Sequence, residues 1–503
     1  MRRVLIANRG EIALRIIRAC HEEGLEAVAV YSEADRLSPH VRAADRAVEI
    51  GPAPASESYL HSERLIAAAR HVGADAVHPG YGFLSERAAF AAAVAEAGLV
   101  FVGPPPAAIR AMGEKTEARR RMAAAGVPVV PGTTEPLRDA DQAIAAAALI
   151  GYPVMLKAAA GGGGKGMRRA DDPAAVRKGF RAAASEARAA FGDDTLYLER
   201  WLERPRHVEI QVLADGHGRV VHLGERECSV QRRHQKLIEE APSAAVDPAL
   251  RARMGDAAVR AAQSVDYLGA GTVEFLLQPD GQFFFLEMNT RVQVEHPVTE
   301  MVYGVDLVRE QLRIAGGQPL SLPPEPPLPW GHALECRITS EDPFNGFLPA
   351  TGRVEYLRVP AGPGVRWDSG IETGTDVGLH YDPLLAKVIV WGETREHAIR
   401  RMAGALDELL VVGVATSQPF HRRVMADPAF GAGRYDIRYL DEIGAALLQA
   451  SPAETDLEIM AIAATLAEHE WRRAPAPIEA PSRADAATSG MRSVRLGALR
   501  WPR

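Results

Sequence analysis

Residues 271–297 read GTVEFLLQPDGQFFFLEMNTRVQVEHP, with two apolar runs joined across the Asp-Gly pair at 280–281. Both positions of that pair tolerate a positive φ, so the stretch predicts a β-hairpin closed by a two-residue turn. Such a turn places Glu274 directly opposite Glu287 on one face of the hairpin. An extra bulge residue, which Pro279 would favour, would instead move one of these glutamates aside.

Two opposed carboxylates repel each other unless a cation lies between them. A divalent metal ion is the simplest such cation, and Asn289, two residues further along the same face, offers another oxygen. Hard oxygen ligands favour Mg²⁺ or Mn²⁺ over zinc. The sequence therefore predicts a metal site formed by Glu274, Glu287 and Asn289.

The polar residues that follow continue this face when the stretch is read as one strand with a period of two. The set is Glu287, Asn289, Arg291, Gln293 and Glu295. An ordinary solvated strand face is the alternative, but such a face more usually carries Lys, Thr and Glu in loose mixture. The order acid, amide, cation, amide, acid therefore favours a functional site.

The composition excludes several classes of protein. At 503 residues, with 47% hydrophobic and 24% charged residues, the chain resembles a globular protein of about three domains. Its formal net charge of −7 argues against a nucleic-acid or membrane-surface binder. Cys20, Cys228 and Cys336 are odd in number and far apart, which favours a reducing compartment over a disulfide framework. No apolar run reaches membrane-spanning length and no signal-peptide cleavage region follows the start, so we expect a cytoplasmic protein.

Lysine is scarce, because only six of the 58 basic residues are Lys. Where Arg supplies most of the positive charge, the remaining lysines are candidates for places that need a compact point charge. They are Lys115, Lys157, Lys165, Lys178, Lys236 and Lys387. A lysine can also remain by chance, and we assign Lys178, within the helical stretch DPAAVRKGFRAAASEARAAF, to this alternative.

The pattern of apolar runs divides the chain into four parts and predicts a mixed α/β and α+β fold. Residues 1–113 alternate strands and helices as a doubly wound α/β unit does. Residues 114–328 form an α+β block, within which 131–203 is a compact segment with its own strands. The Pro-rich stretch GGQPLSLPPEPPLPW marks a boundary before a β-rich part at 331–446. Residues 447–503 contain a helix and an Ala/Pro-rich tail typical of a flexible linker.

A glycine loop lies in YPVMLKAAAGGGGKGMRRADDP, residues 152–173. Its residues are Gly161, Gly162, Gly163, Gly164, Lys165 and Gly166. The loop matches G-x-G-x-x-G, but a dinucleotide site needs a helix to begin there, and the next helix is predicted only from Asp172-Pro173. No Gly-Lys-Ser/Thr follows, so the loop is not a P-loop either. A glycine hairpin can lay backbone N–H groups over phosphates, with Lys157 pointing at them, although a flexible surface turn is the alternative.

Together these features resemble the ATP-grasp fold, in which two α+β lobes hold ATP between them. Several stretches resemble biotin carboxylases more closely, over roughly residues 2–446. They are ANRGEIALRIIRAC, HPGYGFLSE, GEKTEARR, RHVEIQVLADGHGRVVHLGERECSVQRRHQKLIEEAPS, EMNTRVQVEHPVTE and GHALECRI. The resemblance implies a Rossmann-like N-terminal domain, an ATP-grasp domain with a mobile lid at 131–203, and a β-rich C-terminal domain. Thr416-Ser417 and Lys165 depart from residues common in the family without touching the implied chemistry.

The resemblance assigns a nucleotide site. The implied ATP-binding residues are Lys115, Lys157, the loop 161–166, Glu199, Arg200, Leu202, His207, Gln231, His234, Glu274 and Glu287. The two lysines and the loop would neutralise phosphates, the hinge at 199–202 would read adenine, and the strand pair would hold two Mg²⁺ or Mn²⁺ ions. A histidine in a strand more often belongs to the core or the surface, so His207, Gln231 and His234 are the weaker assignments.

The resemblance also assigns the bicarbonate and biotin sites. Bicarbonate would be held by Lys236, Arg291, Gln293 and the Val294 amide. Glu295 would be the base that deprotonates it for attack on the γ-phosphate, which gives carboxyphosphate. Biotin would lie at Tyr81 and Arg337, where Arg337 would stabilise the enolate oxygen of the ureido group. An interdomain ion pair is the alternative role for Arg337.

The expected partners are a biotin carboxyl carrier protein and a carboxyltransferase subunit. No Lys of this sequence is flanked by Met as in carrier domains, so we expect biotin on a separate chain or on a part of the natural protein outside this sequence. The family further implies a homodimer with Arg18 and Glu22 near its interface. The final acceptor stays open between an acyl-CoA, as in the acetyl-CoA carboxylase of fatty acid biosynthesis, and pyruvate. Another ATP-grasp ligase, a dinucleotide-binding module and a noncatalytic scaffold are the alternatives, but none of them needs RRHQK together with RVQVEHP.

Overall fold

The computed structural model describes residues 1–133, 135–158, 167–323, 325, 327–449, 459, 461–466 and 468–469. The chain divides into two units, Met1–Leu448 and Gln449–Arg503, and the described residues beyond 458 are helical. The glycine loop at 161–166 and the Ala/Pro-rich tail lie outside the described residues, so the predictions for them stay predictions. No helix in the described part combines the length and the apolar character that crossing a bilayer requires.

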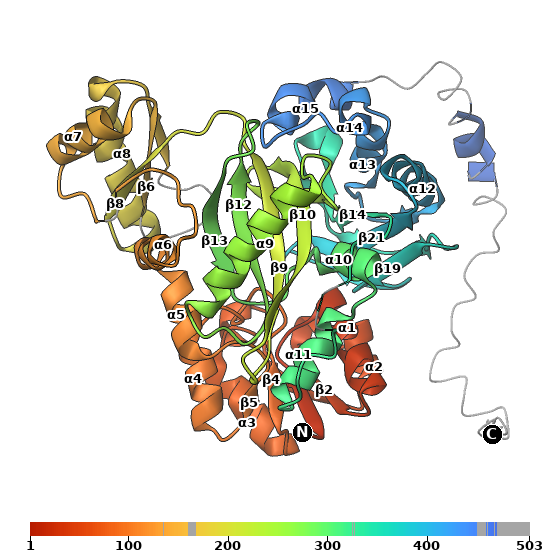
Figure 1. Ribbon diagram of the computed structural model, residues 1–503. Coiled ribbons are helices and arrows are strands. Elements are labelled where there is room, and N and C mark those ends of the chain that lie inside the picture. Colours follow the sequence, from red (N-terminus) through yellow and green to blue (C-terminus); the bar gives the residue numbers. More distant parts are fainter. Residues whose placement is uncertain are drawn as a thin grey trace, which may run out of the picture. The chain divides into compact units, whose positions relative to one another are not determined.

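The N-terminal part folds into a five-stranded parallel sheet with the order β3-β2-β1-β4-β5 (Figure 1). Its strands are β1 (Arg3–Ile6), β2 (Glu26–Ser32), β3 (Arg46–Gly51), β4 (Ala76–His78) and β5 (Val100–Phe101). Its helices are α1 (Gly10–Glu22), α2 (Pro39–Ala43), α3 (Ser62–Val72), α4 (Ala88–Glu96) and α5 (Pro106–Gly113). The predicted doubly wound unit is confirmed. The strand order reverses between β1 and β4, so the loops that follow these two strands open a crevice at the carboxyl edge of the sheet.

Helix α1 shows how this unit anchors a distant loop. Its apolar residues Ile12 and Ile16 recur at helical spacing and are 2% or less exposed. The same cluster of buried side chains contains Val292, which is also fully buried. The segment that follows the predicted hairpin is therefore fixed against the N-terminal part of the chain by hydrophobic packing.

A smaller sheet with the order β7-β6-β8 forms within residues 131–203. Its strands are β6 (Val154–Ala158), β7 (Arg168–Ala170) and β8 (Leu196–Arg200), and its helices are α7 (Ala140–Ile150) and α8 (Pro173–Phe191). Helix α6 (Lys115–Ala124) precedes it. The side chain of Asp172 caps α8 by accepting from the Ala175 amide, so the predicted helix start is confirmed. This small body has its own buried cluster, which includes Val154, Leu156 and Leu198.

The largest sheet has eight strands in the order β13-β12-β9-β10-β11-β14-β21-β19, with antiparallel neighbours. Its strands are β9 (Arg206–Ala214), β10 (Val220–Arg232), β11 (Gln235–Ala241), β12 (Gly269–Leu277), β13 (Phe283–Asn289), β14 (His332–Thr339), β19 (Val365–Ser369) and β21 (Leu384–Gly392). Strand β14 comes after the Pro-rich boundary, yet it pairs with β11 from before that boundary. One continuous sheet therefore joins the second and third parts of the chain.

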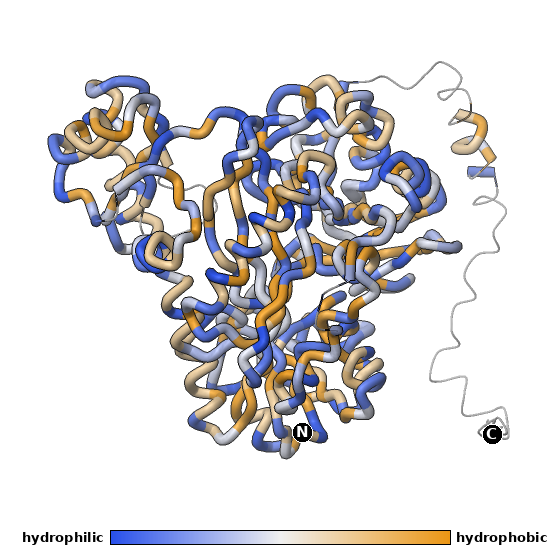
Figure 2. Tube along the Cα trace, in the orientation of Figure 1, coloured by the Kyte–Doolittle hydropathy of each residue, from blue (hydrophilic) through white to orange (hydrophobic). Residues whose placement is uncertain are grey.

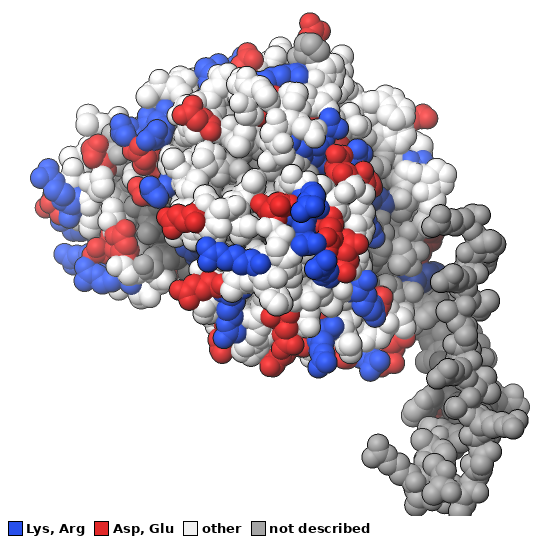
Figure 3. Space-filling view, turned by 90° about the horizontal axis from the view of Figure 1, so that it is seen from below, with Lys and Arg blue, Asp and Glu red and all other residues white. Residues whose placement is uncertain are grey.

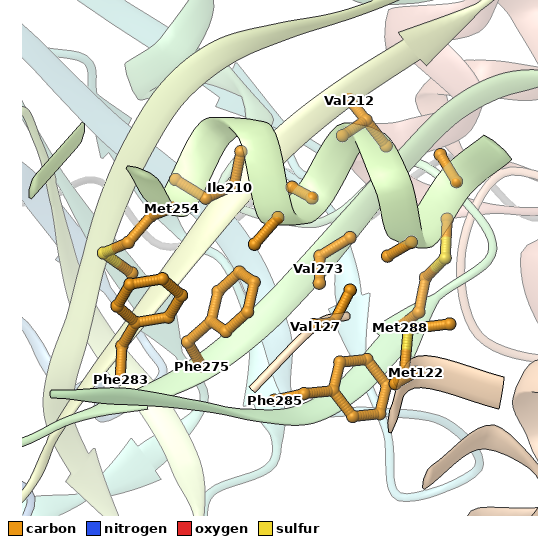
Figure 4. Close-up of a cluster of buried hydrophobic side chains, with 14 of the residues drawn as sticks. Met122, Val127, Ile210, Val212, Met254, Val273, Phe275, Phe283, Phe285 and Met288 are labelled. Carbon is orange, nitrogen blue, oxygen red and sulfur yellow. The ribbon is translucent and has the colours of Figure 1, made fainter. Parts of the chain in front are cut away.

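Helix α9 (Pro248–Gln263) covers one face of this sheet, over a cluster of buried side chains (Figure 4). Phe275 and Phe283 meet edge to face with their ring centroids 5.3 Å apart, a preferred aromatic geometry. Figure 2 shows hydrophobic residues concentrated along these central strands. On the surface seen in Figure 3, acidic and basic side chains are interspersed, so this face offers no continuous basic area for a nucleic-acid backbone.

Most of the remaining elements lie around the β14 end of the sheet, whereas α11 (Leu307–Ala315) packs against α1 and β12. The helices are α10 (His296–Tyr303), α11 (Leu307–Ala315), α12 (Arg395–Glu408), α13 (Gln418–Met425), α14 (Pro428–Gly431) and α15 (Tyr439–Gln449). The short strands are β15 (Glu341–Asp342), β16 (Leu348–Pro349), β17 (Gly352–Arg353), β18 (Tyr356–Arg358), β20 (Asp376–Val377) and β22 (Leu410–Val412). The three cysteines are buried and free, which agrees with the expected lack of a disulfide framework.

The hairpin β12–β13 differs from its prediction near the turn. The Gln278 amide donates to the Gln282 carbonyl, so the loop has three residues rather than two, with Gly281 at φ +79°. A register shift between Glu274 and Phe275 in the β12–β13 pairing then offsets the extra loop residue. Glu274 still pairs with Glu287, so the predicted opposition is confirmed although the predicted two-residue turn is wrong.

Gly281→Ala should destabilise the protein, because an L side chain at this positive φ costs about 1–2 kcal/mol and the space around it is open, so strain acts alone. Gly404→Ala is the matched control. Gly404 lies exposed inside α12 with no atom near the added methyl, so this change should stabilise by about 0.5–1 kcal/mol. Thermal unfolding should move in opposite directions for the two variants; a rise in both midpoints would contradict the loop assignment.

Candidate active site

A cavity of about 1010 Å³ lies where the N-terminal crevice, the small sheet and the eight-stranded sheet meet. Among the predicted residues it is lined by Tyr81, Lys115, Lys157, Glu199, Arg200, Leu202, His207, Gln231, His234, Lys236, Glu274, Glu287, Asn289, Arg291, Gln293, Val294 and Arg337. Glu295 is the exception, since it is 0% exposed and lies behind the cavity wall. The predicted glycines and Lys165 are outside the described residues.

The ammonium of Lys236 lies among three carboxylates at the wall of this cavity. Its Nζ lies 2.6 Å from Glu209 Oε2, 2.9 Å from Glu274 Oε1 and 2.6 Å from Glu295 Oε1. Burial opposes the charge, but the surrounding carboxylates raise the pKa of Lys236 well above its ordinary value. One compact cation thus joins three carboxylates from different elements, as the scarcity of lysine suggested.

Glu209 is a site residue that the sequence prediction missed. It is 0% exposed and bridges Lys236 to the buried guanidinium of Arg226, whose Nε lies 2.6 Å from Glu209 Oε1. His207, Glu209 and Gln211 alternate along β9, whose other residues from Val208 to Ala214 are apolar and buried. That alternation of polar side chains inside an otherwise buried strand is the signal that could have identified Glu209.

The ammonium of Lys236 lies among two groups of side chains that are close enough together to suggest metal ligands. His207, Glu209 and Glu274 bring ligand atoms within 4.8 Å of one another, and so do Glu209, Cys228 and Glu295. In both groups, Lys236 Nζ already contacts two of the carboxylates. A divalent ion there would compete with that ammonium, so these groups are less suitable for metal than the Glu274–Glu287 pair.

The pKa of Glu274 is lowered and that of Glu287 is raised, so a bound cation would stabilise the charged form of Glu287. Lys236 and His207 hold the pKa of Glu274 well below its ordinary value despite burial, and His207 Nε2 lies 3.0 Å from Glu274 Oε2. The pKa of Glu287 is raised by desolvation at the cavity floor and by the charge of Glu274, although its side chain faces the open cavity. The Asn289 amide donates to Glu274 Oε1 over 2.8 Å, so the third predicted ligand lies beside the pair.

The predicted long strand ends earlier than expected, at Asn289. Strand β13 is the edge of its sheet, and residues 290–295 form a turn that leads into α10, so the expectation of one strand through Glu295 is wrong. The side chains converge nevertheless. Arg291 donates to Asn289 Oδ1 over 3.0 Å and to Gln293 Oε1 over 3.2 Å. Gln293 in turn donates to Glu274 Oε1 over 3.2 Å, so the turn keeps the polar groups on one side.

Arg291 and Glu86 form an ion pair that the sequence did not reveal, with Nε 2.9 Å from Oε2. Glu86 is the last residue of the motif HPGYGFLSE in the N-terminal part of the chain, 205 positions before Arg291. Burial opposes the charge of Arg291, but Glu86 raises its pKa. The guanidinium is thus held at the cavity wall from both sides of the crevice.

Glu295 has both carboxylate oxygens engaged. Oε1 contacts Lys236, and Oε2 accepts from Arg337 Nη2 over 2.9 Å. Burial would raise the pKa of Glu295, but Lys236, Arg337 and Arg226 hold it well below its ordinary value. The carboxylate is therefore ionised and fixed in direction beside the cavity.

Arg337 links Glu295 to the neighbouring strand. Its Nε donates to Glu239 Oε1 over 2.6 Å, and β11 and β14, which carry these residues, are adjacent in the sheet. Arg337 therefore forms ion pairs, which were the alternative to its biotin-binding role, and its side chain also lines the cavity. Across the cavity the Tyr81 hydroxyl donates to Glu11, another residue that the sequence prediction missed.

The small sheet contributes a second group of charges. Lys157 and Arg119 both pair with the buried carboxylate of Glu199. Burial lowers the pKa of Lys115, which also lies near Lys157. The amides of Arg200 and Trp201 donate to the Pro131 and Pro153 carbonyls, which fixes the hinge segment at the cavity wall. The Arg119–Glu199 pair spans 80 positions and carries no local sequence signal.

His234 and Gln231 lie at the turn between β10 and β11. Arg233 and His234 both have positive φ values, +50° and +65°, in a tight turn that exposes the imidazole of His234. Gln231 pairs across that turn with Lys236 in the register of the two strands. The motif RRHQK thus serves as a turn that presents Lys236 to the cavity.

Known proteins resemble this chain over most of its length. Residues 1–109 match the biotin carboxylase N-terminal domain, 114–322 the ATP-binding domain of the carbamoyl-phosphate synthase L chain, and 335–442 the biotin carboxylase C-terminal domain. A biotin carboxylase of Nostoc sp. is 53% identical over 88% of this chain and 99% of its own length. A pyruvate carboxylase subunit of Methanothermobacter thermautotrophicus is 49% identical over 88% of this chain and 89% of its own.

A solved structure adds ligands to this resemblance. The dimeric biotin carboxylase domain of Hydrogenobacter thermophilus 2-oxoglutarate carboxylase, in complex with MgADP, ADP and bicarbonate, superimposes with a TM-score of 0.85. It is 44% identical and covers 90% of this chain and 99% of that one.

The charge cluster predicts a specific pH dependence of stability. Burial raises the pKa of Glu239 to about 7, against the lowering influence of Arg337. A carboxyl with a raised folded-state pKa stabilises the fold below its unfolded pKa, near 4.5, and loses that contribution as pH rises through about 7. The unfolding free energy of the wild type relative to Glu239→Gln should therefore fall on the order of 2 kcal/mol between pH 4.5 and pH 8. Urea unfolding across this range measures the difference, and a constant difference would contradict the assignment.

Proposed function

The chain belongs to the biotin carboxylase family, and from that premise we propose how its own residues divide the reaction. It is an ATP-grasp ligase that carboxylates biotin with bicarbonate at the expense of ATP, with Mg²⁺. The observation that carries the assignment of residues is the single ammonium of Lys236, which touches a carboxylate of the metal pair and the carboxylate of the base at once. Another ATP-grasp ligase needs the metal pair but has no use for that second contact.

The proposed division of the chain has four parts. They are an N-terminal domain at 1–113, an ATP-grasp domain at 114–328, a C-terminal domain at 331–446 and a tail at 447–503. The separate sheet and cluster of residues 131–203 support a lid that closes over the nucleotide. The continuous sheet through β11 and β14 supports a rigid floor beneath that lid.

ATP would lie between the small sheet and the β9–β13 strands. Lys115, Lys157 and the glycine loop would face the phosphates, and the hinge at 199–202 would face adenine. Phosphoryl transfer depends on neutralised charge rather than on covalent help, and both lysines line the cavity. His207, Gln231 and His234 are proposed towards the ribose and phosphates.

Glu274, Glu287 and Asn289 would hold the metal. The oxygen atoms of these side chains suit a metal ion. Glu274 and Glu287 face each other, and burial together with the negative charge of Glu274 raises the pKa of Glu287, so a cation between them would stabilise both carboxylates. When bound, Mg²⁺ neutralises the charge of the ATP phosphate oxygens. Within this chain, Lys236 and the Asn289 amide both donate to Glu274 Oε1, which holds that carboxylate in place beside Glu287.

Bicarbonate would bind between Lys236, Arg291, Gln293 and the Val294 amide, with Glu295 as base. The planar fork of Arg291 suits a planar anion, and its ion pair with Glu86 holds it in place. Despite burial, Lys236, Arg337 and Arg226 lower the pKa of Glu295 and so keep it weakly basic. A bound anion would share Lys236 and Arg337 with Glu295, which raises the pKa of that carboxylate towards the value that proton abstraction needs.

The biotin ureido group would then lie at Arg337 and Tyr81. Breakdown of carboxyphosphate gives CO₂ and a phosphate that deprotonates the ureido nitrogen, and Arg337 would stabilise the enolate oxygen that results. Tyr81, in the loop after β4, and Arg337, on β14, line the same cavity, which supports a ligand between them. Their partners Glu11 and Glu239 would hold the two side chains in direction.

We propose a cytoplasmic enzyme that forms a homodimer and acts on biotin carried by a separate carrier protein, with a carboxyltransferase subunit completing the reaction. Arg18 and Glu22 are exposed on α1, as a dimer interface there requires. The first half-reaction of an acyl-CoA carboxylase is the primary candidate. The resemblance to the Methanothermobacter pyruvate carboxylase chain favours a two-subunit pyruvate carboxylase as the second candidate.

Glu295→Gln should abolish bicarbonate-dependent turnover and leave folding and ATP binding intact, because the amide keeps the shape and removes the basicity. ATP hydrolysis measured with and without bicarbonate and free biotin tests both the function and the base. The wild type should require both compounds, and the variant should lose about 100-fold or more of that activity. Hydrolysis by the wild type that ignores bicarbonate would refute the function, whereas near-normal turnover of the variant would refute the base alone.

Lys236→Arg should also fail, since a longer planar fork cannot place one charge within 2.6–2.9 Å of three carboxylates. We expect a loss of about 100-fold in turnover. Lys178→Arg, the same exchange at an exposed position of α8, is the control and should match the wild type. Equal activity of the two variants would show that a compact charge is not needed.

A further inference from the structure

Lys387 is a buried lysine for which the proposed reaction gives no role. It lies on β21, is 0% exposed and does not line the cavity. Its Nζ donates to the Val294 carbonyl over 2.8 Å and lies 3.2 Å from Glu11 Oε1. A charged side chain is buried at high free-energy cost, so its contacts are expected to serve a purpose.

Its position in the sheet explains how it reaches these partners. Lys387 pairs with Arg337 on one side and with Asp368 on the other, so three ionisable residues form a row across β14, β21 and β19. Helix α10 begins at His296, directly after Glu295, and packs on these strands (Figure 1). The row therefore lies beneath the turn that carries the proposed base.

The charge of Lys387 is retained in this setting. Burial opposes it, but Glu11 and Asp368 raise the pKa of Lys387 above its ordinary value. The ammonium thus donates as a cation to the Val294 carbonyl, a stronger contact than a neutral donor would make. That carbonyl belongs to the peptide group that joins Val294 to Glu295.

We propose that Lys387 is a positioning residue for bicarbonate activation. By fixing the Val294–Glu295 peptide plane, it directs the Glu295 side chain towards Lys236 and Arg337. Through Glu11 it also joins this turn to Tyr81, so a line of contacts runs from the proposed biotin side to the base. The inference rests on the proposed role of Glu295.

Lys387→Met tests the proposal, because Met has a similar length and no donor. We expect kcat to fall about 10-fold or more and the KM for bicarbonate to rise about 10-fold, since a small displacement of the base costs rate steeply. The Kd for ATP should stay within about two-fold, because the nucleotide residues lie on other elements. Single-turnover ATP hydrolysis and nucleotide titration measure these quantities.

Two further variants separate positioning from stability. Glu11→Gln/Lys387→Met removes the uncompensated carboxylate, so it should regain thermal stability relative to Lys387→Met while its bicarbonate kinetics stay impaired relative to Glu11→Gln alone. Arg395→Met removes another cation, which is partly buried and whose Nε lies 2.7 Å from Glu240 Oε2 away from the Val294 turn. It should lower stability and leave the KM for bicarbonate unchanged.

Kinetics that recover together with stability in the double variant would overturn the proposal, and so would an equal kinetic defect in Arg395→Met. Failure of both Lys387 variants to fold would assign the residue a purely structural role and overturn it too. These outcomes are distinct from failure of the proposed function, which would appear as wild-type ATP hydrolysis independent of bicarbonate.

Discussion

The contact on which the site depends is one ammonium group shared by three buried carboxylates. Glu209 on β9, Glu274 on β12 and Glu295 before α10 would repel each other in a cavity of low polarity, and Lys236 on β11 offsets all three. The arrangement also connects the proposed metal pair to the proposed base without a direct contact between them. A change in charge at Glu274 therefore alters the electrostatic environment of Glu295 through Lys236, and a change at Glu295 alters that of Glu274.

The sheet makes this arrangement possible. Strands β12, β9, β10 and β11 are consecutive neighbours, and β14 adds Arg337 at the next position. Because neighbouring strands lie close together and alternate their side chains, residues far apart in the sequence reach one cavity from a flat support. The N-terminal sheet contributes its crevice loops from the other side, where Tyr81 and Glu86 meet the turn at 290–295. The strands of the large sheet thus supply most of these charged groups, and the crevice loops and the turn at 290–295 complete the site.

Much of this could be predicted, and the failures have physical reasons. The opposition of Glu274 and Glu287 was found although the turn length was wrong, because the bulge offsets the longer loop. The end of β13 could not be read from polarity, since alternation continues to Glu295 but the edge strand has no further partner. Lysine scarcity identified Lys236, Lys115 and Lys157 without any structural knowledge. Glu209, which pairs with Lys236, Glu86, which pairs with Arg291, and Arg119, which pairs with Glu199, were missed because long-range ion pairs leave no local pattern. For Glu209 alone, the alternation along β9 could have revealed it.

The shared eight-stranded sheet has a consequence for synthesis of the chain on the ribosome. Strand β11 is complete at Ala241, whereas its partner β14 begins at His332, so roughly ninety residues must be translated before the edge of β11 can be paired. During that interval an open strand edge and the apolar face beneath α12 and α13 are available to other nascent chains. Truncation anywhere between these strands would leave that edge exposed permanently. The natural place to divide this protein into independently expressible pieces is therefore not the Pro-rich boundary, even though the sequence pattern ends a domain there.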